Sequence, residues 1–140
     1  MKKLLITIDG PAGAGKTTVS RTLADRLGYR YIDTGALYRA VALAVKRRGC
    51  SPENDAEIKR VCAEIELTLV QKKEGWCLFL NREDIVDRIR TADITMLASA
   101  ISARPVVREC LLDLQRNLGK EKAAVFEGRD MGTVVFPEAD

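Results

Sequence analysis

Two spacings of apolar residues alternate along the first fifty positions of the chain. Short runs at 3–8 and 29–33 have the length of strands, and the first is continuously apolar, as in a parallel strand buried on both faces. Each run is followed by a stretch with helical spacing, at 16–28 and 34–49. Strand, helix, strand and helix in this order predict an α/β domain built on a parallel sheet.

Both helices are expected to bury one apolar face and to end at a glycine. The first has Val19, Leu23 and Leu27 four residues apart, which places them on one face. The second has a longer apolar set, formed by Leu37, Val41, Ala44 and Val45. Gly28 and Gly49 stand where a helix C-terminus favours glycine.

The pattern changes after residue 50. A third helix is predicted over 51–65, capped by Ser51 or Asn54, and two apolar segments around QKKEG then form a β-hairpin. Two more helices follow, over 93–103 and from Pro105 to Gly119, before an apolar strand within 123–130. We therefore expect a core of residues 1–63, an inserted α+β subdomain of 64–120 that holds the antiparallel hairpin, and a return to the core over 121–140.

Composition narrows the classes of function. The chain has 140 residues, 46% of them hydrophobic, which suits one soluble domain with a small insertion. Its apolar runs are too short for a membrane span or a signal peptide. The net charge of +3 is scattered, and the densest cluster, KRR at 46–48, suits a solvated helix end better than a nucleic-acid site. We expect neither a membrane nor a nucleic acid as partner.

The cysteine and histidine content limits which metal sites and which catalytic groups the chain can have. The four cysteines form no CxxC pair and the chain has no histidine, so zinc sites built on histidine are excluded. Free thiols in a reducing cytoplasm are the simplest interpretation. Any catalysis must also work without histidine, the commonest general base.

One motif directly indicates a ligand. Residues 10–17 fit G-x-x-x-x-G-K-[ST] at every fixed position, between a predicted strand and a predicted helix. Glycines let backbone N–H groups surround phosphates, and the helix N-terminus adds positive potential. Lys16 can reach the β- and γ-phosphates, and the Thr17 hydroxyl can ligate Mg²⁺. The motif predicts a nucleoside triphosphate but leaves the second substrate open.

Three other groups of residues have two interpretations each. Thr34 and Arg39 follow the second strand, where ligands bind in open α/β sheets, but Thr34 also suits a helix cap and Arg39 a surface charge. Arg129 and Asp130 follow the last strand and suit a phosphate and a base amino group, or a charged turn. Ser99 and Arg108 lie on predicted helices of the insertion and, on pattern alone, are surface residues.

The motifs IDGPAGAGKTT, DTGALYR, IRTADITMLAS with RPVVREC, and EGRDMGTVVFPEA resemble those of bacterial cytidylate kinases, in order and spacing over the whole chain. These enzymes belong to the nucleoside monophosphate kinases. The resemblance implies a three-layer P-loop fold, here with a partial sheet, and an inserted subdomain that binds the nucleotide acceptor. It also implies that the chain is the N-terminal portion of a longer protein, because relatives continue with an arginine-rich lid and further core elements.

The resemblance implies a role for each site residue. The P-loop set would bind ATP: Gly10, Pro11, Ala12, Gly13, Ala14, Gly15, Lys16, Thr17 and Thr18. The acceptor set would bind CMP: Thr34, Arg39, Ser99, Arg108, Arg129 and Asp130. Lys16, Arg39 and Arg129 would act in catalysis, and Thr17 would hold Mg²⁺. Many relatives have glycine at position 17, and threonine there restores a hydroxyl for the metal.

The expected reaction moves the γ-phosphoryl group of ATP to CMP or dCMP, in the cytoplasm and in a protein that is monomeric at full length. The acceptor is a phosphate monoester, ionised at neutral pH because its second pKa is about 6, so it needs no general base. Two alternatives remain. One is a kinase for another small phosphate acceptor, and the other is a nucleotide-binding chain without turnover because the lid is absent.

Overall fold

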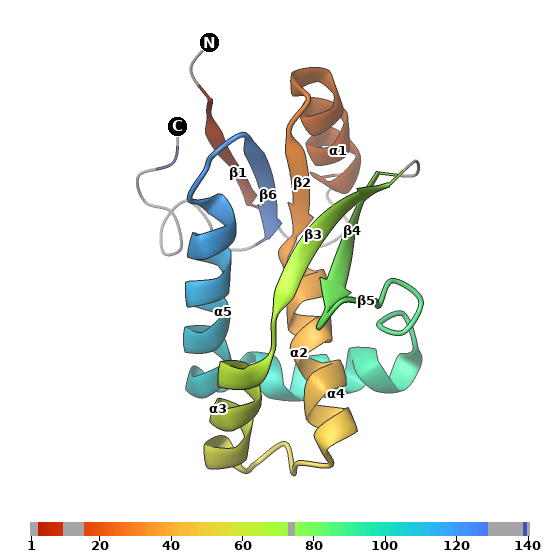
Figure 1. Ribbon diagram of the computed structural model, residues 1–140, viewed down its shortest axis with the longest axis vertical. Coiled ribbons are helices and arrows are strands. Elements are labelled where there is room, and N and C mark those ends of the chain that lie inside the picture. Colours follow the sequence, from red (N-terminus) through yellow and green to blue (C-terminus); the bar gives the residue numbers. More distant parts are fainter. Residues whose placement is uncertain (1–2, 10–15, 73–74, 129–138, 140) are drawn as a thin grey trace. The chain divides into compact units, whose positions relative to one another are not determined.

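A computed structural model of the chain describes residues 3–9, 16–72, 75–128 and 139, and its elements follow the predicted order (Figure 1). The side chains of Lys16, Gln71 and Trp76 are outside this description. The chain divides into two compact units, one formed by Met1–Thr34 with Gln115–Asp140 and the other by Gly35–Leu114. We call them the P-loop unit and the inserted unit.

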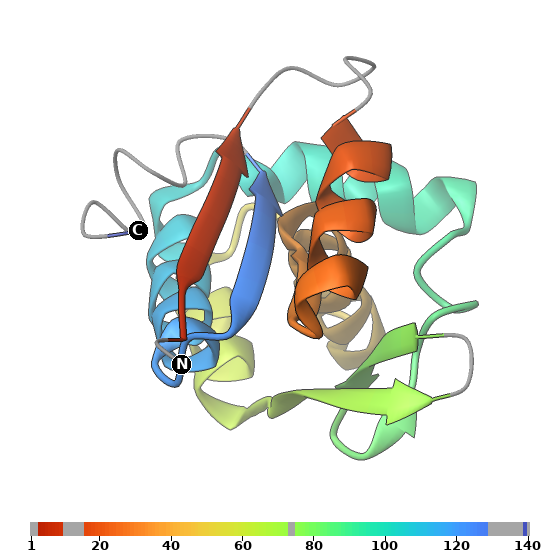
Figure 2. The same ribbon diagram turned by 90° about the horizontal axis from the view of Figure 1, so that it is seen from above.

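The P-loop unit is built on a parallel sheet of three strands, β1 (Leu5–Asp9), β2 (Arg30–Asp33) and β6 (Ala124–Gly128). Their spatial order is β1-β6-β2, so the last strand in the sequence occupies the centre (Figure 2). The register pairs Asp9 with Gly128 and Asp33 with Glu127. The three carboxyl ends therefore share one edge of the sheet, and this confirms the predicted parallel α/β core.

The central strand carries most of the core of this unit. All five residues of β6 are buried, and Phe126 is among the largest fully buried side chains. Burial of every residue is expected of a central parallel strand covered on both faces. The outer strands β1 and β2 are only partly buried.

Helix α1 (Lys16–Leu27) packs on β6 and β2, but through a face that we did not predict (Figure 2). Val19 is 59% exposed and Leu27 is 41% exposed, whereas Ser20 and Ala24 are buried. The spacing of four was right and its phase was wrong by one residue. Leu23 is half-buried, and the two buried residues of the inner face have short side chains. Gly28 ends α1 with a φ of 68°, as predicted.

The inserted unit begins within α2 (Thr34–Arg48), whose predicted apolar residues are all buried. Its other elements are α3 (Asp55–Glu64), β3 (Leu67–Lys72), β4 (Gly75–Leu80), β5 (Glu83–Asp84), α4 (Ala92–Ser102) and α5 (Pro105–Gly119), the last of which belongs to this unit as far as Leu114. Asn54 caps α3, since its side-chain oxygen accepts a hydrogen bond from the Glu57 N–H at 3.2 Å.

The predicted hairpin is present in the inserted unit. Strands β3 and β4 pair antiparallel, with Leu67 opposite Leu80, and the two-residue strand β5 extends the sheet on the other side of β4. We did not predict β5, because two residues carry too little periodicity to identify a strand. The antiparallel sheet is separate from the parallel one, which confirms an α/β fold with an inserted antiparallel element.

The basic cluster at 46–48 is the last turn of α2, as predicted. Lys46 pairs with Asp93, Arg48 with Glu64, and Arg47 holds Glu83 through two hydrogen bonds of 2.7 and 2.9 Å. The Lys46 ammonium lowers the pKa of Asp93 to about 2. These exposed pairs connect the end of α2 to its neighbours, but they contribute little to stability because solvent screens their charges.

Two further expectations concern the chain as a whole. Among the described residues, none of the helices has the length and apolarity required to traverse a bilayer. The division by function into 1–63, 64–120 and 121–140 stays a prediction, because the two units are defined by compactness alone.

Candidate functional site

The P-loop sequence lies between β1 and α1, as its motif requires. Strand β1 ends at Asp9 and helix α1 begins at Lys16. The residues 10–15 and the side chain of Lys16 lie outside the described part of the chain. The strand–loop–helix connection is thus present, and the free N–H groups of the first turn of α1 provide positive potential at its start.

A buried carboxylate lies against the start of this helix. Glu127, near the end of β6, is only 6% exposed, and its Oε2 accepts a hydrogen bond of 3.0 Å from the Thr17 hydroxyl. Its Oε1 accepts a second hydrogen bond of 3.0 Å from the Tyr31 hydroxyl on β2. Each carboxylate oxygen therefore has one neutral donor, and the two donors come from different elements.

The Tyr31 phenol is kept protonated by its surroundings. Burial, followed by the negative charges of Asp33 and Glu127, raises the pKa of Tyr31. The Arg21 guanidinium lies over the Tyr31 ring, 5.3 Å from its centroid, in a cation–π arrangement. Tyr31 is thus a hydrogen-bond donor to Glu127 throughout the physiological pH range.

The oxygens of Thr17 and Glu127 fit a Mg²⁺ ion. Mg²⁺ takes hard oxygen ligands and is usually held by one or two carboxylates together with substrate phosphates. A threonine hydroxyl that donates its proton to Glu127 still presents a lone pair in another direction. Thr17 is exposed, so that lone pair is open to a ligand.

Sequence reasoning missed Glu127 and Tyr31. Four apolar or small residues followed by an acid at the end of a strand, AAVFE, were a usable signal for Glu127, since the carboxyl edge of a parallel sheet is where ligands bind. Tyr31 had no comparable signal, because an aromatic residue inside a strand is ordinary core material.

Thr34 is buried, and its hydroxyl donates a 2.9 Å hydrogen bond to the backbone carbonyl of Glu127. It begins α2 directly after β2, so one of its functions is to join this chain segment to β6. Its predicted place near CMP stays a prediction.

Two predicted acceptor residues, Arg39 and Arg108, belong to the inserted unit. Tyr38 and Arg39 lie in the early part of α2, and Arg39 is half-buried. Burial raises the pKa of Tyr38, and the charge of Arg108 on α5 opposes this rise. Arg108 is therefore near enough to α2 to act on Tyr38, and its own side chain is exposed.

Of the remaining predicted acceptor residues, only Ser99 lies in the described part of the chain. Ser99 is exposed on α4, where its backbone carbonyl accepts a hydrogen bond from Ser102. Arg129 and Asp130 lie outside the described residues, directly after β6.

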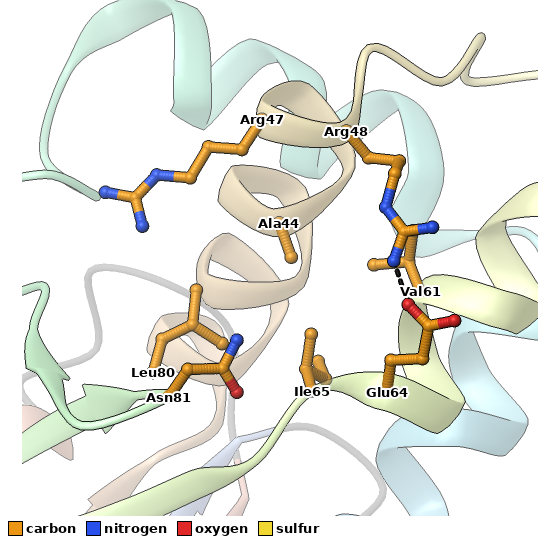
Figure 3. Close-up of a pocket in the computed structure, with 8 residues that line it drawn as sticks. All are labelled: Ala44, Arg47, Arg48, Val61, Glu64, Ile65, Leu80 and Asn81. Atoms are coloured by element: carbon orange, nitrogen blue, oxygen red, sulfur yellow. Dashed lines mark hydrogen bonds and ion pairs between the residues drawn. The ribbon is translucent and has the colours of Figure 1, made fainter.

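A separate pocket of about 400 Å³ in the inserted unit is lined by none of the predicted site residues (Figure 3). Ala44, Val61, Ile65 and Leu80 line it with apolar surface. Arg48 on its rim is paired with Glu64 (Figure 3), so its charge is already balanced, and we assign this pocket no role.

A protein-family model and several curated proteins that this chain resembles carry the same description. A family model described as "Cytidylate kinase" matches residues 6–140. A cytidylate kinase of Geobacter sulfurreducens is 54% identical over 138 residues, which are 98% of this chain and 59% of that protein. Those of Syntrophotalea carbinolica and an Exiguobacterium species are 48% and 43% identical, and each match covers 99% of this chain.

The chain spans 59% to 62% of the length of these curated relatives. The matched region includes the P-loop motif, the start of α1, and the Glu127 carboxylate at the end of β6. Because the family model covers nearly every residue, this chain belongs to the cytidylate kinase family.

Proposed function

We propose that the protein to which this chain belongs transfers the γ-phosphoryl group of ATP to CMP or dCMP and releases ADP. The observation that carries the donor half is the hydrogen bond between Thr17 and the buried Glu127 carboxylate at the start of α1. The family match over residues 6–140 supports CMP as the acceptor.

The reaction requires positioning rather than a general base. An oxygen of the CMP phosphate attacks the γ-phosphorus, and the bond from that phosphorus to the β-γ bridging oxygen breaks, so that ADP leaves with the electron pair. The acceptor oxygen is ionised at neutral pH because the second pKa of a phosphate monoester is about 6. A chain without histidine is compatible with this chemistry.

We assign the metal to the oxygens of Thr17 and Glu127. Mg²⁺ held there would neutralise charge that develops during transfer. The Thr17 hydroxyl would face the metal with its lone pair while it donates its hydrogen bond to Glu127. The backbone N–H groups of residues 10–15 and the Lys16 ammonium would hold the phosphates of ATP.

We assign the acceptor to residues of the inserted unit and to those that follow β6. Arg39 and Arg129 would hold the CMP phosphate, because a guanidinium donates two hydrogen bonds to one phosphate. Ser99, Arg108 and Asp130 would recognise cytosine, and Thr34 would lie near the nucleotide. The charge of Arg108 on α5 acts on Tyr38, the neighbour of Arg39 in α2.

Acceptor specificity tests the proposal most directly. The complete gene product would be assayed for coupled ADP release with ATP, Mg²⁺ and one acceptor at a time: CMP, dCMP, UMP or AMP. We expect CMP and dCMP to give rates far above a control without acceptor, and AMP to give little. Equal rates with AMP and CMP would contradict the assignment of Ser99, Arg108 and Asp130 to cytosine.

A second candidate function is nucleotide binding by these 140 residues without turnover, and the coverage of 59% of the first two relatives favours testing it. Calorimetry would measure CMP and ATP affinities of this chain alone, beside its ADP release. Binding of both nucleotides without ADP release above background would support the second function for the isolated chain. Turnover comparable to that of the complete gene product would exclude it.

We propose the cytoplasm as the place of action. Cys62 and Cys110 are neighbouring thiols that share a hydrogen bond, and a reducing compartment maintains thiols in this state. A monomeric state stays a prediction, which the mass of the complete gene product in solution would test.

A further inference from the structure

Tyr31 contacts the Glu127 carboxylate of the proposed metal site, although Tyr31 belongs to no sequence motif. Its hydroxyl donates to Glu127 Oε1 at 3.0 Å, while the Thr17 hydroxyl donates to Oε2 of the same carboxylate, also at 3.0 Å. The two donors lie on either side of the carboxyl group and leave it little freedom to rotate about its terminal torsion.

The fold explains why these side chains meet. Asp33 pairs with Glu127 and Tyr31 pairs with Val125 in the parallel register of β2 and β6. Alternate residues of a strand share a face, so Tyr31 and Glu127 lie on the same face of the sheet. Helix α1 packs on β6 and brings Thr17 to the carboxylate, and Arg21, one turn later, to the Tyr31 ring.

We propose that Tyr31 is a positioning residue for the Mg²⁺ site, which acts by fixing the Glu127 carboxylate so that Thr17 presents its lone pair to the metal. Groups that hydrogen-bond to metal ligands orient them, and loss of such a group typically lowers metal affinity or activity about 10- to 100-fold. Arg21 contributes by holding the Tyr31 ring from above. This inference rests on the proposed function, because it assumes that Thr17 and Glu127 serve a metal.

The structure supplies a matched control. Tyr29 belongs to the same unit and its hydroxyl oxygen also makes a hydrogen bond, accepting one from the Leu4 N–H at 2.9 Å. Tyr29→Phe and Tyr31→Phe therefore remove the same atom from the same kind of residue. Only the second removal deprives Glu127 of a donor.

The test compares ATP affinity with and without metal in the complete gene product. Calorimetry with excess Mg²⁺ and with EDTA gives two dissociation constants, and their ratio measures how much Mg²⁺ strengthens ATP binding. We expect Tyr31→Phe to reduce this ratio about tenfold, with metal-free affinity unchanged. Tyr29→Phe should leave the ratio as in the parent, and melting temperatures should show that both variants are folded.

A double-mutant cycle shows whether Tyr31 acts through Glu127. In a Glu127→Gln background, adding Tyr31→Phe should not change the ratio further. As a single variant, Tyr31→Phe should lower kcat while the KM for CMP stays constant. An unchanged ratio in Tyr31→Phe, or an equal loss in the Glu127→Gln background, would overturn the inference alone. A parent protein whose ATP affinity does not respond to Mg²⁺ would overturn the proposed metal site as well.

Discussion

Three hydroxyl groups of the P-loop unit donate hydrogen bonds to Glu127. Its carboxylate accepts from Thr17 on α1 and from Tyr31 on β2, and its backbone carbonyl accepts from Thr34. Because a carboxylate accepts hydrogen bonds from both donors at once, it fixes their hydroxyl protons toward itself. An amide in its place presents one donor group and loses the negative charge.

Glu127→Gln tests this residue with little change in volume. We expect kcat for CMP phosphorylation to fall about 10- to 100-fold, because a carboxylate that is assigned to the metal and that also orients the Thr17 hydroxyl is lost. Steady-state assays of the complete gene product would measure it, with thermal melting as the folding control. Glu121→Gln, at an exposed position before β6, is the matched control and should retain the parental kcat. A Glu127→Gln variant with parental kcat would contradict the role.

The thiols of Cys62 and Cys110 should differ in reactivity. A hydrogen bond from the Cys110 thiol lowers the pKa of Cys62, and the same bond, with burial, raises the pKa of Cys110. A lower pKa means more thiolate at a given pH, so alkylation of Cys62 should begin below the range of an ordinary thiol, whose pKa is about 8.5.

Alkylation by iodoacetamide over a pH series, followed by peptide mass spectrometry, would measure this difference. In Cys110→Ala the onset for Cys62 should move to higher pH, because burial, which raises the pKa, then acts without the hydrogen bond. Cys50, whose pKa is raised by burial and by Glu57, provides a second comparison and should react later than Cys62. An unchanged onset in Cys110→Ala would show that the hydrogen bond does not control Cys62.

At the scale of the element, α1 differs most from its sequence pattern. Its inner face consists of small residues, so added volume there should disrupt packing against β6 and β2. Ala24 is 1% exposed, and we expect Ala24→Leu to lower the free energy of unfolding by about 1–3 kcal/mol. Val19→Leu adds volume at an exposed position of the same helix and should stay within about 0.5 kcal/mol of the parent. Urea titrations would measure both, and equal stability of the two variants would show that Ala24 does not limit the packing.

The example of α1 shows where sequence reasoning succeeds and where it stops. Element types and order follow from local periodicity and turn residues, and the glycine ends of α1 and α2 were predicted for the right physical reason. The buried face of α1 was wrong because an aliphatic set and a small-residue set have the same spacing of four. Only the tertiary partner decides between them, since a close helix–sheet approach favours Ser20 and Ala24.

In the candidate site too, sequence patterns identified residues within one motif but not their partners from distant strands. The P-loop motif indicated Thr17 because its chemistry is local in sequence. Its partner Glu127 lies 110 positions further along the chain, and Tyr31 reaches Glu127 only through the register of β2 with β6. Such pairs depend on strand order, and the order β1-β6-β2 places the last strand between the first two. Sequence spacing alone does not reveal this order.

At the scale of the whole molecule, the residues assigned to ATP fall within the ranges of the P-loop unit, whereas those assigned to CMP fall within the ranges of both units. Thr17 and Glu127 belong to the P-loop unit, whereas Arg39, Ser99 and Arg108 belong to the inserted unit. We therefore expect ATP to reduce backbone opening in the P-loop unit, and CMP to reduce it in the inserted unit as well, because a ligand stabilises the conformations that bind it.

Hydrogen–deuterium exchange of the complete gene product would test this division. We expect ATP with Mg²⁺ to slow exchange in peptides from α1 and β6, and CMP to slow exchange in peptides from the first half of α2, from α4 and from the start of α5.

Arg108→Ala should abolish the CMP-dependent protection and keep that of ATP, because Arg108 is exposed and its loss leaves the core intact. Arg60→Ala, exposed on α3, is the matched control and should preserve both. CMP-dependent protection confined to α1 and β6 would place the acceptor in the P-loop unit and contradict the assignment of Ser99 and Arg108.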